Sequence, residues 1–71
     1  MNQAILFNDD HSYIADIKTW KFTGLMSGVL ITIHIKHAAT EINQQQKFIW
    51  EDLVEDWLEH NEPDEDAEIW L

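Results

Sequence analysis

The sequence predicts a small α+β domain in which a three-stranded antiparallel sheet is followed by two helices, in the order β-β-β-α-α. Three observations support this prediction: apolar residues alternate with period two before residue 37, a glycine turn divides the alternation, and helical spacing takes over after residue 46. The 71 residues are the length of one domain, 1–71. Within it we expect a sheet part over 1–37 and an acidic helical part over 47–71.

The predicted strands follow one another closely. Residues 3–7 form a β-prone stretch that ends in the turn composition of residues 8–10. Residues 18–26 alternate, with Trp20 and Phe22 on one face, and Gly28 supplies a positive φ for the next turn. The last strand then places four β-branched residues on one face and four others on the opposite face: Val29, Ile31, Ile33 and Ile35 against Leu30, Thr32, His34 and Lys36.

The helical part begins after a polar connection over residues 38–46, where Thr40 or Asn43 is a suitable N-cap. An amphipathic helix is predicted over roughly 47–60. Its apolar stripe starts at Ile49 or Trp50 and continues through Leu53, Val54, Trp57 and Leu58. Pro63 suits the first position of a second short helix, which would carry acids in its first turn and end in residues 69–71.

The net charge of −10 is confined to one end of the sequence. Four acids and four lysines cancel over residues 1–50, whereas residues 51–71 hold ten acids and no base. Such a field disfavours direct binding to nucleic acid or to an anionic membrane surface. It favours a partner with a lysine- and arginine-rich surface.

The acids of the main helix lie opposite its apolar stripe, and several are i, i+4 neighbours of like charge. Each such pair destabilises a helix by a few tenths of a kcal/mol, so stability alone does not explain the pattern. Acids after Pro63 need less explanation, because they would stabilise a helix start. Two interpretations remain open: a solvated face, or a surface that binds a basic partner. The second predicts these contact residues: Glu51, Asp52, Glu55, Asp56, Glu59, Glu62, Asp64, Asp66 and Trp70.

The sequence offers no convincing catalytic, cofactor or metal site. Cysteine is absent, which excludes thiolate ligands and disulfides. His34 and His37 are three apart at a strand end and therefore face opposite sides, while residues 9–11 have the composition of an ordinary turn. Ser12 beside His11 is no nucleophile motif, and no glycine-rich phosphate loop is present. A catalytic pocket of about 300 Å³ would also consume most of so small a core. We therefore predict a protein that is not an enzyme.

The four tryptophans and the hydropathy give weaker indications. Trp20, Trp50 and Trp57 are expected to fill the core, and Trp70 to be partly exposed. A three-stranded sheet leaves an open edge, which makes a homodimer plausible. No apolar run approaches the roughly 20 residues of a membrane span. The first residues lack the basic start and apolar stretch of a signal peptide, so the expected location is the cytoplasm of a bacterium or of a phage-infected host.

Three segments carry a resemblance to a known family: Met1–Phe7, Trp20-Lys21-Phe22-Thr23 and Gly28-Val29-Leu30-Ile31. They resemble the short bacterial domain-of-unknown-function family fourteen-eighty-eight, and residues 58–68 are similar to its second helical region. The resemblance implies a β-β-β-α-α fold, and because the family has no established activity it assigns no catalytic residue. The chain departs from the family in being shorter and more acidic toward its end. In size and charge it is also similar to phage-encoded acidic inhibitors, including anti-CRISPR proteins.

These inferences predict a non-enzymatic interaction module that binds a basic protein surface. In its sharper form the chain is a nucleic-acid-mimicking inhibitor of a nucleic-acid-binding protein, for which a CRISPR effector is one candidate. The alternative is a homodimeric bacterial protein of unknown role whose acidic face serves only solubility.

Overall fold

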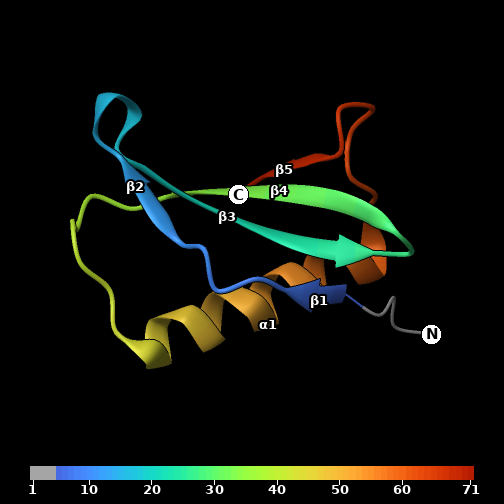
Figure 1. The fold of residues 1–71 in the computed structure, drawn as a ribbon, viewed down its shortest axis with the longest axis horizontal. Helices are drawn as coiled ribbons and strands as arrows, with labels where there is room; N and C mark the ends of the chain where they lie inside the picture. Colours follow the sequence, from blue (N-terminus) through green and yellow to red (C-terminus); the bar gives the residue numbers. More distant parts are fainter. Residues whose placement is uncertain (1–4) are drawn as a thin grey trace.

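The computed structural model describes residues 5–71 as one five-stranded sheet with a single helix packed against one of its faces (Figure 1). The elements follow one another as β1 (Ile5–Phe7), β2 (Ser12–Ile14), a 3₁₀ turn (Ala15–Ile17), β3 (Thr19–Met26), β4 (Val29–Lys36), α1 (Gln44–His60) and β5 (Glu68–Trp70). The predicted α+β class is confirmed. Gln3 and Ala4, which belong to the first predicted strand, lie outside the described residues.

The β3–β4 hairpin is the predicted one. Trp20 pairs with Ile35 and Phe22 with Ile33 in an antiparallel ladder that extends to Met26 and Val29. Ser27 and Gly28 both have positive φ, at 52° and 80°, which is the geometry of a two-residue type I′ turn. Because every second side chain of both strands points to the same face, the hairpin supplies an apolar surface for α1.

The first edge of the sheet is interrupted, which the sequence did not indicate. β1 and β2 both pair antiparallel with β3, and residues 8–11 bulge out between them. Thr23 holds this bulge: its carbonyl accepts from Asn8 N at 2.8 Å, and its N–H donates to Asp10 Oδ1 at 2.9 Å. Asn8 and Asp10 therefore replace the missing ladder bonds, and the predicted turn is a bulge within one edge of the sheet.

Helix α1 begins three residues earlier than predicted. Asn43 is its N-cap, with Oδ1 accepting from Gln46 N at 2.8 Å, so Asn43 rather than Thr40 fills that role. Its buried stripe is narrow, comprising Trp50, Val54 and Leu58. These pack with the apolar residues of β1, β3, β4 and β5 into one core: Ile5, Trp20, Phe22, Ile31, Ile33, Ile35 and Ile69.

The predicted second helix is wrong, and the three-stranded antiparallel sheet is incomplete. The chain after α1 returns to form β5, which lies parallel to β4 and pairs Ile69 with Ile33. Asp64 makes the turn that sends it back, since its Oδ1 accepts from Asp66 N and Glu68 N at 3.0 and 2.9 Å. Side-chain capping of backbone N–H groups occurs in such turns as well as at helix starts, which is why the acidic pattern was ambiguous.

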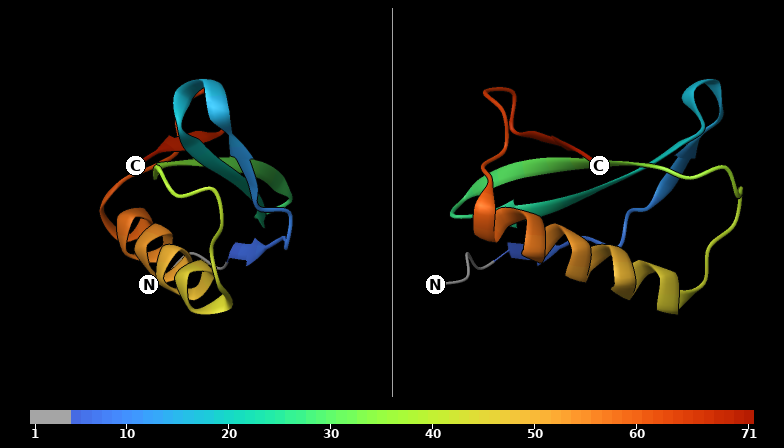
Figure 2. Two further views of the ribbon diagram at one scale, coloured as in Figure 1. Left: turned by 90° about the vertical axis from the view of Figure 1, so that its left-hand side faces the viewer. Right: turned by 180° about the vertical axis from the view of Figure 1, so that it is seen from behind.

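The two faces of the sheet differ sharply. Figure 2 shows α1 beneath one face and no element over the other. We call this other side the open face. By strand register and alternation it carries Leu6, Lys21, Thr23, Leu25, Leu30, Thr32, His34, Lys36, Glu68 and Trp70. Leu6, Leu25 and Leu30 form an exposed apolar row across β1, β3 and β4. No helix among residues 5–71 has the length and apolar character needed to span a membrane.

Candidate interaction surface

The five acids predicted on the main helix do lie together on α1. They occupy the arc that faces away from Trp50, Val54 and Leu58, and we call this arc the carboxylate ridge: Glu51, Asp52, Glu55, Asp56 and Glu59. All but Glu51 are exposed, and Glu51 is half-buried at the margin of the core. The periodicity that predicted a helix therefore also placed these five acids on one side of it.

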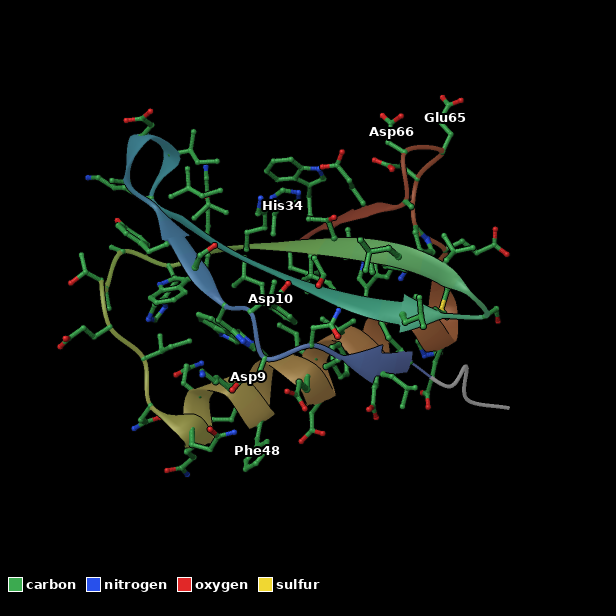
Figure 3. All side chains as sticks on the ribbon, in the orientation of Figure 1. Asp9, Asp10, His34, Phe48, Glu65 and Asp66 are labelled. Carbon is green, nitrogen blue, oxygen red and sulfur yellow. The ribbon has the colours of Figure 1, made fainter. Side chains whose placement is uncertain are left out.

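Phe48 stands within the ridge and was not predicted as a site residue. It precedes Glu51 and Asp52 by three and four positions, so these side chains are neighbours on the helix surface. The Phe48 residue is 55% exposed, and Figure 3 shows it pointing away from the sheet. Its helical angle places it outside the apolar stripe that begins at Ile49 or Trp50. A helical projection of the sequence alone would therefore have placed Phe48 among the acids.

The carboxylates of the ridge repel one another. Burial raises the pKa of Glu51 above its ordinary value, and Glu55 and Asp52 raise that pKa further through charge repulsion. Asp9 acts in the same direction, whereas Lys47 lowers the pKa of Glu51. An approaching cationic group would therefore find a site where negative charge is already unfavourably crowded.

Lys47 lies at the first end of the ridge but is engaged elsewhere. Its Nζ lies 3.0 Å from Asp9 Oδ1. This hydrogen bond and the positive charge of Lys47 both lower the pKa of the Asp9 carboxyl. The pair joins α1 to the bulge of residues 8–11. Within the described residues, the ridge itself carries no basic side chain on its exposed arc.

The remaining predicted contact residues do not extend the ridge. Glu62 is exposed just beyond the end of α1. Asp64 is occupied in its turn by two backbone N–H groups, and Asp66 projects from that turn on the far side of the sheet (Figure 3). Trp70 is 58% exposed, as expected, but it lies on the open face with its ring stacked 3.8 Å from that of His34. The predicted set therefore belongs to separate surfaces.

The histidines are placed in structural surroundings. His34 Nε2 lies 2.8 Å from Glu68 Oε1 on the open face, while His37 meets Trp50 edge-on on the other side of the sheet. The two rings therefore lie on opposite sides of the sheet, as predicted. Among residues 5–71, no three histidine and acidic side chains are grouped so as to hold a metal ion.

His11 has the most unusual position of any polar side chain described. Its side chain is only 2% exposed, and the ring stacks on Phe22 with 4.3 Å between centroids. Both ring nitrogens are buried, and neither has a hydrogen-bond partner among residues 5–71. Burial lowers the pKa of His11, and the nearby Lys47 ammonium lowers it further, against the opposing effects of Asp9 and Asp10.

Comparison with solved structures shows a related fold. The chain is similar to the crystal structure of a protein of unknown function from the DUF1488 family of Shewanella loihica PV-4, with a TM-score of 0.65 and 22% sequence identity. The match covers 100% of this chain and 94% of the other. The fold resemblance predicted from residues 1–7, 20–23 and 28–31 is thereby confirmed over the whole chain. The sequence matches no protein-family model and no curated protein.

Proposed function

We propose that this chain is a non-enzymatic interaction module whose carboxylate ridge binds a lysine- and arginine-rich surface of a partner protein. One observation carries the proposal: four exposed carboxylates and the half-buried Glu51 line one side of α1 with an exposed phenylalanine and no basic residue. A surface needed only for solubility would intersperse both signs of charge. The cytoplasm is the location we propose for this binding.

The ridge has the two components of a binding surface. Its carboxylates give long-range attraction to a basic partner and charge-assisted hydrogen bonds on contact. Phe48 offers an aromatic ring on which an arginine can stack, worth about 0.5–1 kcal/mol at an exposed site. Binding would also relieve the repulsion that raises the pKa of Glu51.

The sharper proposal is that the ridge occupies a nucleic-acid-binding site. Glu51, Glu55 and Glu59 succeed one another every four residues, which corresponds to about 6 Å along a helix. A row of negative charge at this spacing can compete with a phosphate backbone for the lysines and arginines that bind it. An inhibitor of a nucleic-acid-binding protein, with a CRISPR effector as one candidate target, would use the ridge in this way.

The exposed leucine row of the open face favours a second candidate. Leu6, Leu25 and Leu30 form adjacent exposed positions on three strands, and Leu6 is 71% exposed. Two copies could cover this row by packing their open faces together, and the acids would then serve only solubility. A tight dimer that binds no basic partner would support this alternative.

The experiment that tests the proposal starts with affinity capture from the native host after nuclease treatment, so that nucleic acid does not bridge proteins. Binding of the captured partner is then measured for Glu55→Lys/Asp56→Lys. We expect the affinity to fall more than tenfold and the salt dependence of binding to diminish.

A matched control is available on the turn of residues 64–67. Glu65→Lys/Asp66→Lys makes the same change in net charge at two exposed positions away from the ridge (Figure 3). We expect this variant to keep the affinity within about threefold, since distant exposed charges are largely screened. Equal losses in the two variants would show that net charge, and not the ridge, determines binding.

A further inference from the structure

Three of the four lysines gather at one end of the sheet, although the chain as a whole is strongly acidic. Lys21 and Lys36 are exposed on the open face, where Lys21 pairs with His34 and Lys36 pairs with Thr19. Lys18 joins them from the residue before β3, since its carbonyl accepts from His37 N at 3.1 Å. This end of the molecule is therefore locally basic.

A hollow of about 410 Å³ lies between two of these lysines. Lys18 and Lys36 line it together with the apolar residues Ile17 and Ala38, and Asp16 is the one acid in its lining. Ile17 is 47% exposed, which is high for a large apolar side chain. The lining of the hollow thus combines two lysines with two apolar side chains.

The matching surface is present on the same chain. Phe48 is an exposed aromatic ring with Asp52 one helical turn further along and Glu55 about one turn beyond that, and it points away from the sheet (Figure 3). We propose that the hollow receives Phe48 of a second copy of this chain in a head-to-tail contact. The Asp52 and Glu55 carboxylates of that second copy then pair with Lys18 and Lys36. The inference rests on the ridge of the proposed function as a binding surface, but it adds a different occupant and a different site.

The geometry of this contact determines the kind of assembly. The surfaces that meet are different, so the contact is heterologous, and successive copies add head to tail into a ring or an open chain. Each copy carries a charge of −10, which opposes association. At about 0.15 M salt, charges farther apart than roughly 8 Å are screened, whereas the pairs in direct contact still attract. We therefore expect weak association that disappears at about 1 M salt, where screening reaches about 3 Å.

Sedimentation equilibrium of the full chain tests the proposal. At ~1 mM protein, a concentration that populates contacts with a millimolar Kd, the mean mass of the wild type should exceed that of a monomer. Two variants each remove one half of the contact: Lys18→Glu/Lys36→Glu alters the hollow, and Asp52→Lys/Glu55→Lys alters the ridge. Each variant should stay monomeric by itself, with circular dichroism confirming that it is folded.

The mixture of the two variants is the decisive measurement. The intact ridge of the hollow variant can meet the intact hollow of the ridge variant, and the two altered surfaces are again opposite in charge. An equimolar mixture should therefore associate, although neither variant associates by itself. A monomeric wild type at ~1 mM, self-association of the Lys18→Glu/Lys36→Glu variant, or a mixture that does not associate would each overturn the proposal.

The same variants separate this inference from the proposed function. Lys18→Glu/Lys36→Glu leaves the ridge intact, so it should bind the basic partner at least as well as the wild type does. If that variant binds the partner and the wild type never self-associates, the function stands and the head-to-tail contact is wrong.

Discussion

Replacing His11 by phenylalanine should stabilise the protein. The His11 ring stacks on Phe22 and lies beside Trp50, with centroid distances of 4.3 and 6.4 Å, and its two nitrogens have no hydrogen-bond partner among residues 5–71. A buried polar group without a partner costs about 1–3 kcal/mol. A phenyl ring keeps the stacking and removes both nitrogens, so we expect His11→Phe to raise the free energy of unfolding by about 1–3 kcal/mol at pH 7.5.

The stabilisation should grow as the pH falls. The pKa of His11 in the folded protein is lowered, chiefly by burial, whereas in the unfolded chain it lies near its ordinary value of about 6.5. Between these two values the unfolded chain binds more protons, so acidification below about 6.5 favours unfolding of the wild type. His11→Phe lacks this contribution. Its advantage over the wild type should therefore be larger at pH 5.5 than at pH 7.5.

Urea denaturation followed by tryptophan fluorescence measures both effects. The difference between variant and wild type at each pH cancels the groups that the two proteins share. A gain of 1 kcal/mol would appear in thermal melts as a shift of roughly 4–8 °C for a domain of this size. A destabilised variant at pH 7.5, or a difference that does not change with pH, would refute the reasoning about the buried ring.

Three further changes test other contacts. Glu51→Gln should stabilise the protein by a few tenths of a kcal/mol at pH 7. The pKa of Glu51 is raised in the folded state, so the wild type loses stability as the pH rises through that pKa, whereas the glutamine variant does not. Urea melts at pH 3.5 should therefore show a smaller gain. Asp64→Ala should destabilise by about 1–2 kcal/mol, since two backbone N–H groups lose their acceptor, whereas Glu65→Ala in the same turn should change stability by less than about 0.5 kcal/mol. Asn43→Ala removes the acceptor for Gln46 N and should lower the thermal midpoint through a loss of about 1 kcal/mol; an unchanged midpoint would contradict the cap.

The sequence predicted those elements whose side chains repeat with a clear period. The hairpin of β3 and β4 was found because eight-residue strands show several cycles of alternation and a glycine turn separates them. Helix α1 and its ridge followed from a sustained helical period. The start of α1 was missed because Gln44, Gln45 and Gln46 have good helix propensity but no apolar pattern.

The three-residue strands could not be found in the same way. β2 has only Ser-Tyr-Ile, which is too short to show a period, and its place depends on the pairing of Tyr13 with Trp20. β5 did contain a signal, because Ala67, Ile69 and Leu71 alternate toward the core. That signal competed with a proline and acids typical of a helix start. Residues 68–70 form a strand because they pair with β4, and this pairing leaves Ile69 only 1% exposed.

The position of Phe48 and the gathering of Lys18, Lys21 and Lys36 have a different origin. Phe48 could be placed from helical angles alone, because its neighbours lie on the same element. The lysines come together only through the β3–β4 pairing and the backbone contact between Lys18 and His37. The net charge of residues 1–50 is zero, so the charge pattern along the sequence does not reveal this local basic surface.

The parallel pairing of β5 has a consequence for the order of folding. Ile33 meets Ile69, 36 residues further along the chain, so this pairing closes a loop whose entropy costs about 3 kcal/mol before any contact repays it. The hairpin and α1 close much shorter loops and can form first. The last strand to join should then be β5, and Ile69→Val should speed unfolding while leaving the folding rate nearly unchanged. Stopped-flow rates that show slower folding in this variant would place β5 in the folding nucleus instead.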